Sequence, residues 1–192
     1  MTPSGLVLAT QEPSNVTGHI TSSQVLRTAS DAERVTELTA GELFQAMREH
    51  VREARRADED DALLAHVLAL ARAQEIEERA WAMTALGGVL AAFGHLEDAL
   101  ETLRAAVRLQ PSAQTKLAAL VCAAAIRCDQ GEYADAVRIG ELVLTRTGDA
   151  SLLRVLGEVY LRTAAEAADG RLREQGRRCF ERAELEDALT RA

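Results

Sequence analysis

The sequence has few aromatic residues and few prolines: three Phe, two Tyr, one Trp and three Pro among 192 residues. β-Sandwiches and barrels need β-branched and aromatic residues and frequent turns, so this composition argues against an all-β fold. The chain also lacks any apolar run near the ~18 residues that a membrane span needs. Its first residues lack the basic and apolar regions of a signal peptide. We therefore expect no membrane span.

Basic charge and cysteine are scarce as well. The net charge is −8. A nucleic-acid-binding chain would instead carry a basic face, so we expect no nucleic-acid partner. There are only three cysteines, an odd number, and Cys122 and Cys128 lie in an apolar helical run. This pattern favours buried, reduced thiols over a disulfide framework, and with them a cytoplasmic location.

Alanine is abundant, with 36 of the 192 residues. Because alanine has the highest helix propensity, we expect an all-α fold. Residues 1–29 differ from the rest, since they are rich in Ser and Thr and show no helical period. We expect 1–29 to be a flexible N-terminal segment. The alternative is an arm that orders on a partner or on a second subunit.

Residues 30–79 are predicted to form a degenerate helical hairpin. Thr39-Ala40-Gly41-Glu42 has the spacing of a capping box, in which each end residue satisfies a free backbone N–H group. Apolar residues follow at helical spacing. We expect helices over about 41–57 and 61–78. The apolar residues expected to be buried in the second helix are Leu63, Leu64, Val67, Leu68 and Ala71.

A short segment recurs further along the chain. Gly94-His95-Leu96-Glu97-Asp98-Ala99-Leu100 returns 37 residues later as Gly131-Glu132-Tyr133-Ala134-Asp135-Ala136-Val137. In each copy a glycine suits an abrupt turn between two helices, because glycine adopts positive φ without strain. Ala99 and Ala136 stand where two helices would cross closely. The recurrence predicts consecutive helical hairpins.

These residues resemble the tetratricopeptide repeat (TPR) family, whose pattern is W-x2-L-G-x2-Y, then A-x3-F, then A and P, over about 34 residues. The unit at about 80–113 matches at Met83, Leu86, Gly87, Leu90, Gly94, Ala99, Leu103, Ala106 and Pro111. The unit at about 117–149 is weaker and keeps Leu120, Ala123, Ala124, Gly131, Tyr133, Ala136 and Val143. The unit at about 150–185 keeps Leu153, Leu156, Gly157, Tyr160, Phe180 and Ala183.

The third unit carries about seven extra residues around 165–171, which could be a longer helix pair or a loop. The resemblance implies that antiparallel helical hairpins stack as a TPR-like right-handed superhelix over 80–192, because single hairpins cannot bury both of their apolar sides. The hairpin at 30–79 would be a degenerate unit before about three TPR units.

In TPR proteins the first helix of each hairpin lines a concave groove that holds partner peptides. By helical phase, the resemblance places nine residues in this groove: Thr84, Gly88, Ala91, Val121, Ala125, Cys128, Arg154, Glu158 and Leu161. Most of them are small or apolar, and they lack the Lys and Asn of a carboxylate clamp. We therefore expect a protein–protein interaction scaffold or adaptor that binds an extended, partly apolar segment of a partner protein.

Other functions stay open at this point. The size and layout also resemble class II type III secretion chaperones, which hold translocator proteins. Another alternative is a TPR regulatory or sensor module that acts with a separate DNA-binding protein, and a homodimer is a further alternative. The sequence contains no P-loop, G-x-G-x-x-G, H-E-x-x-H or Cys-x2-Cys pattern. We expect no enzymatic activity, no cofactor and no metal site.

Overall fold

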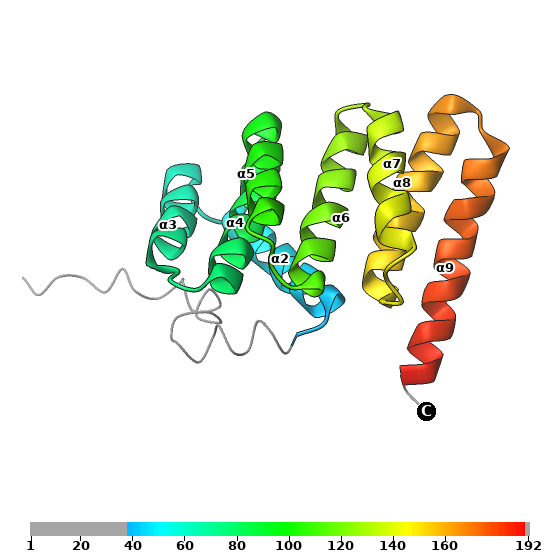
Figure 1. The fold of residues 1–192 in the computed structure, drawn as a ribbon. Coiled ribbons are helices and arrows are strands. Elements are labelled where there is room, and N and C mark those ends of the chain that lie inside the picture. Colours follow the sequence, from blue (N-terminus) through cyan, green and yellow to red (C-terminus); the bar gives the residue numbers. More distant parts are fainter. Residues whose placement is uncertain (1–37, 191–192) are drawn as a thin grey trace, which may run out of the picture.

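The computed structural model describes residues 38–190, and this part of the chain is all-helical, as the composition predicts. Its helices are α2 (Ala40–Ala54), α3 (Glu59–Arg72), α4 (Ile76–Ala92), α5 (Leu96–Arg108), α6 (Ala113–Asp129), α7 (Tyr133–Leu144), α8 (Ala150–Ala167) and α9 (Gly170–Thr190) (Figure 1). The predicted flexible segment 1–29 lies outside the described residues. Within residues 38–190, no helix is both long enough and apolar enough to cross a membrane.

Six of these helices form three successive hairpins, α4–α5, α6–α7 and α8–α9 (Figure 1). The second helix of each hairpin packs against the first helix of the next, as α5 does on α6 and α7 on α8. The first helices α4, α6 and α8 also pack on one another in order. Each hairpin therefore contacts only its neighbours, and the core runs along the row.

The three hairpin turns share one backbone motif. Gly94 and Gly131 have φ values of 90° and 79°, the left-handed conformation expected for the two recurring glycines. The residue after each glycine donates its N–H to a carbonyl five residues back, as His95 does to Leu90 at 3.0 Å. The third turn has the same bond, but Ala168 takes the left-handed position with φ of 50°. The extra residues at 165–171 therefore lengthen α8 and α9 and do not form a loop.

Small residues stand where the two helices of a hairpin cross. A Cβ atom on Gly87 would lie 2.8 Å from Leu103 Cγ, and one on Gly157 would lie 2.6 Å from the Phe180 ring. Ala99 and Ala136 are fully buried. Because side chains in a core are close-packed, a larger residue at these crossings would push the helices apart.

Polar contacts between successive hairpins follow the repeat period. They join residues 33 to 38 positions apart, as in the bond from Gln130 Nε2 to Glu97 Oε1 at 2.8 Å. Arg162 donates to Asp129 at 2.6 Å across α8 and α6. These bonds lie at exposed side chains, so they fix register more than they stabilise the core.

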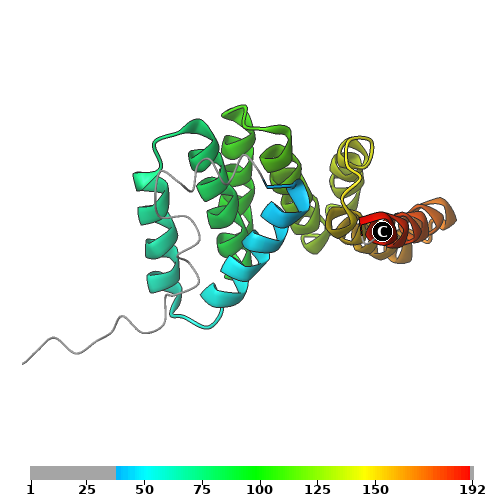
Figure 2. The ribbon, with the colours of Figure 1, turned by 90° about the horizontal axis from the view of Figure 1, so that it is seen from below.

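The first two described helices depart from the predicted hairpin. Both form, as α2 and α3, but α2 packs against α6, α4 and α8 and makes only slight contact with α3. Figure 2 shows α2 lying obliquely across the row of hairpins. Helix α3 packs mainly on α4, and Leu64, Val67, Leu68 and Ala71, expected to be buried, are exposed. The apolar side of α2 packs against α4 and α6, which offer it a larger apolar surface than α3 does.

Candidate functional site

The first helices α4, α6 and α8 turn one face toward α2, and we call this the first-helix face. Helix α2 is amphipathic: Leu43, Phe44 and Met47 are buried, while Arg48 and Glu49 on the other side are exposed. The three buried side chains belong to one core cluster with Trp81 of α4, Val121 of α6 and Leu152 of α8. Helix α2 thus covers Val121 and Gly88, two of the residues that were predicted to line a partner groove.

The N-terminal end of α2 is held by a shared carboxylate. Thr39 and Glu42 form the predicted capping box. The next free N–H, of Gly41, donates to Asp149 Oδ2 at 3.0 Å. Asp149 Oδ1 also accepts from the backbone N–H of Ser151 at 2.9 Å at the start of α8. One carboxylate therefore caps two helix N-termini, where negative charge is favourable. Gly41 has no space for a Cβ atom, because Asp149 occupies it.

The middle of α2 approaches α4 most closely at Gly88. A Cβ atom there would lie 2.5 Å from Met47 Sδ and 3.2 Å from Val51 Cγ2. Gly88 is one of the predicted groove residues, and here its small size admits a helix of the same chain. The sequence did not indicate that a helix of the same chain would contact Gly88.

The C-terminal end of α2 meets two other rings. The His50 ring centroid lies 5.3 Å from that of His66 on α3 and 6.4 Å from that of Trp81 on α4. Burial, reinforced by His66 and opposed by Glu53, lowers the pKa of His50 to about 4. His66 Nδ1 donates to the Ala62 carbonyl, whereas His50 Nδ1 and His66 Nε2 are buried without hydrogen-bond partners. Neutral His50 is therefore required for this end of α2 to stay packed.

The nine predicted groove residues do not form one open surface. Thr84, Gly88, Val121 and Cys128 are buried, and Ala91 and Ala125 are half-buried. Cys128 lies against the α8 backbone, with its Sγ 4.0 Å from the Val159 carbonyl. At the other end of the row, Arg154 pairs with Asp187 and Leu161 packs on Gly176, both on α9, while Glu158 is exposed. A partner could reach Gly88 and Val121 only if α2 moved, whereas Cys128 is covered by α8.

The contacts that hold α2 in place were not predicted from the sequence. Asp149 had a local signal, since an aspartate before an apolar run is a typical helix cap. Nothing local indicated that its carboxylate would also bind Gly41. His50 and His66 are 16 positions apart on different helices, so no spacing rule connects them. The three cysteines are free and buried, as expected.

Comparison of the chain with protein-family models, with curated proteins and with solved structures finds no match. In residues 38–190, no group of three or more His, Cys, Asp or Glu side chains is placed to hold a metal ion.

Proposed function

We propose that this chain is a cytoplasmic protein-interaction module of the TPR type, in which the stacked hairpins form a right-handed superhelix. On this proposal the first-helix face binds a partly apolar segment of another protein. The sequence pattern at Gly87, Ala99 and Gly157, and the packing of small residues at those positions, support it. The partner's segment would take the place that α2 occupies.

The observation that carries the proposal is α2 itself. The first-helix face accepts an amphipathic helix through Leu43, Phe44 and Met47, with glycine at the closest approach. The occupant is a helix rather than the extended segment that the sequence suggested. We therefore propose a helical partner segment that carries large apolar residues at positions i, i+1 and i+4.

The energetics define what a partner must supply. Full burial of a Leu, Phe or Met side chain contributes about 1.5–3 kcal/mol, so the three buried side chains of α2 contribute at most about 5–9 kcal/mol together. A partner helix must bury a similar area to displace α2. Because α2 is tethered, its effective concentration is high, on the order of millimolar for a short linker. A free peptide should therefore bind weakly until the docking of α2 is impaired.

The proposal can be tested with the full chain and a labelled peptide of residues 39–55. In Phe44→Asp, a buried charge should detach α2 and open the first-helix face. We expect this variant to bind the peptide by fluorescence anisotropy and the wild-type chain to bind it at least tenfold more weakly. Gln45→Asp is the matched control, because Gln45 is the exposed neighbour on the same helix. The same peptide carrying Asp at the Phe44 position should not bind.

A second variant loosens the N-terminal end of α2. Gly41→Ala places a methyl group against Asp149 and should loosen the helix with less damage to the core. If Phe44→Asp and Gly41→Ala both keep their helical circular dichroism and neither binds the peptide, the first-helix face is not a binding surface. If they bind it, affinity purification with Phe44→Asp and Gln45→Asp as paired baits should retain a partner selectively on the former. The peptide should compete that partner off.

A further inference from the structure

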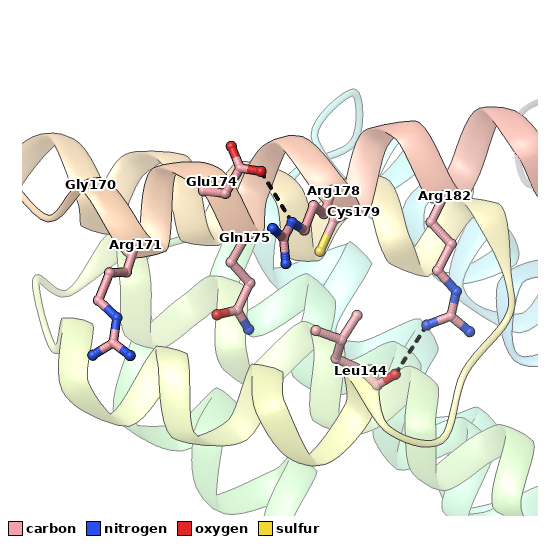
Figure 3. Close-up of a pocket in the computed structure, with 8 residues that line it drawn as sticks. All are labelled: Leu144, Gly170, Arg171, Glu174, Gln175, Arg178, Cys179 and Arg182. Carbon is pink, nitrogen blue, oxygen red and sulfur yellow. Dashed lines mark hydrogen bonds and ion pairs between the residues drawn. The ribbon is translucent and has the colours of Figure 1, made fainter.

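A second hollow lies on the opposite side of α8, between α7 and α9. These two helices both pack on α8 and make little direct contact with each other. The cavity between them has a volume of about 680 Å³. Figure 3 shows Arg171, Gln175 and Arg178 of α9 directed toward α7, with Leu144 at the end of α7 below them. We call this hollow the α7–α9 cleft.

The charge of the α7–α9 cleft is opposite to that of the protein. Arg171, Arg178 and Arg182 line it against a single carboxylate, Glu174. Residues 170–182 hold five arginines and two glutamates, in a chain whose net charge is −8. Arginine near a helix N-terminus opposes the helix dipole, which favours anions there. Asp169 supplies the negative charge at this terminus, because its Oδ1 accepts from the backbone N–H groups of Arg171 and Leu172, so the Arg171 side chain is not needed there.

The three arginines differ in how many of their hydrogen-bond donors already have partners. Arg182 is anchored, because its Nη2 donates to the Thr147 carbonyl at 2.8 Å and its Nη1 to the Leu144 carbonyl at 3.5 Å (Figure 3). Arg178 Nε donates to Glu174 Oε1 at 3.1 Å, which leaves the two terminal nitrogens of Arg178 for a ligand. The guanidinium of Arg171 has no hydrogen bond or ion pair within the described part of the chain. Two guanidinium groups therefore have donors free for a carboxylate ligand.

The spacing of these arginines defines the shape of a ligand. Positions 171, 178 and 182 lie along one side of α9 and span about 16 Å at 1.5 Å per residue. An extended peptide advances about 3.3 Å per residue, so five or six residues cover this span. The distance from Arg171 to Arg178 then corresponds to about three residues of an extended peptide, and the distance from Arg178 to Arg182 to about two. Small-molecule sites bury most of their ligand, whereas these arginines are exposed, so an open trough suits a peptide better.

We propose that the α7–α9 cleft binds an extended acidic segment of a partner protein, with carboxylates spaced as in E-x-x-E-x-E. Arg171 and the free end of Arg178 pair with two of these carboxylates. Arg182 holds the cleft open through the α7–α8 connection and contributes positive charge. Leu144 and Cys179 supply an apolar floor for the side chains between the acids. This surface is separate from the first-helix face, so either can exist without the other.

The test uses the full chain and a fluorescein-labelled peptide, E-A-A-E-A-E, with Q-A-A-Q-A-Q as its uncharged counterpart. The double variant Arg171→Gln/Arg178→Gln should weaken binding of the acidic peptide at least tenfold. Arg173→Gln/Arg177→Gln is the matched control, since it removes the same charge from exposed positions of α9 that do not line the cleft. It should change the affinity by less than about threefold. Phe44→Asp should leave this binding unchanged, which separates the test from that of the first-helix face.

Three results would overturn the α7–α9 cleft as a peptide site. The acidic peptide could fail to bind, or both double variants could weaken it equally, which would indicate only general charge attraction. Inorganic phosphate could also displace it at equal concentration, which would indicate an anion site without preference for a peptide. Selective loss in Arg171→Gln/Arg178→Gln, together with no binding of the glutamine peptide, supports the proposal.

Discussion

The three hairpins and the two helices before them carry similar apolar patterns but bury them to different degrees. In α4–α8 every helix packs on neighbours from more than one side, and Leu103 of α5 is 1% exposed. In α3 only one side is covered, and Leu64 is 56% exposed. Both segments show apolar residues at helical spacing. The difference is whether a partner helix of matching shape follows next in the chain, as it does in the hairpins.

Helix α2 shows what happens when that partner is missing. The end of α2 meets the start of α3 at a small cluster of Ala54, Ala62 and Val89, and the two helices do not close into a hairpin. The first-helix face provides a smooth apolar surface, with Gly88 at its closest approach. Helix α2 therefore buries its stripe against residues up to 108 positions away, as the Gly41–Asp149 bond shows. The stability of the hairpins and the position of α2 should thus respond to different changes.

The largest expected effect contrasts the two regions directly. Leu103→Ala leaves a cavity at the crossing with Gly87 and should lower the free energy of unfolding by about 2–5 kcal/mol. Leu64→Ala removes an exposed side chain and should change it by less than about 0.5 kcal/mol. Urea denaturation followed by far-UV circular dichroism measures both. Equal losses would mean that α3 is as closely packed as the hairpins, contrary to its exposure.

A smaller effect should separate α2 from the hairpins by pH. The pKa of His50 is about 4 in the folded chain against 6.5 when unfolded. Above pH 6.5 both states are neutral and His50 contributes nothing. As the pH falls from 6.5 toward 4, only the unfolded state gains the proton, so stability is lost. The loss at about pH 5 should be on the order of 2 kcal/mol.

The measurement is the free energy of unfolding of wild-type and His50→Gln chains at about pH 7.5 and pH 5. The variant should lose less stability on acidification than the wild type. His95→Gln is the control, because it makes the same substitution at an exposed histidine. Amide hydrogen exchange at pH 5 should show α2 opening before α8. An unchanged pH dependence in His50→Gln would contradict the role assigned to this ring.

The sequence predicted local features better than long-range ones. Capping at Thr39 and the turns at Gly94 and Gly131 depend on residues within one or two helical turns, and all are present. A stripe such as Leu43, Phe44 and Met47 predicts burial, but it does not specify which surface covers it. That choice depends on the relative areas of distant faces, which one sequence does not display.

The two candidate sites illustrate the same limit. The helical phase of Gly88 predicted a groove position, whereas its contact with Met47 depends on the path of α2. The arginines of α9 resemble a solvated helix face with ion pairs such as Glu174–Arg178. They line a cleft only because α7 lies opposite them at a distance set by α8. The charge on a helix can be predicted from the sequence, whereas the element that lies opposite that charge cannot.

The smallest expected effect tests whether the third turn is a true member of the repeat. Ala168 adopts the left-handed conformation that Gly94 and Gly131 adopt in the other two turns. That conformation costs a residue with a Cβ about 1–2 kcal/mol, while glycine adds about 0.4–1 kcal/mol of entropy to the unfolded chain. Ala168→Gly should therefore stabilise the chain by about 0.5–1 kcal/mol in thermal or urea denaturation. Ala167→Gly, one residue earlier and inside α8, should destabilise it by up to about 1 kcal/mol, because glycine is a poor helix former. Opposite signs at adjacent alanines would identify backbone conformation, rather than loss of a methyl contact, as the feature that the three turns share.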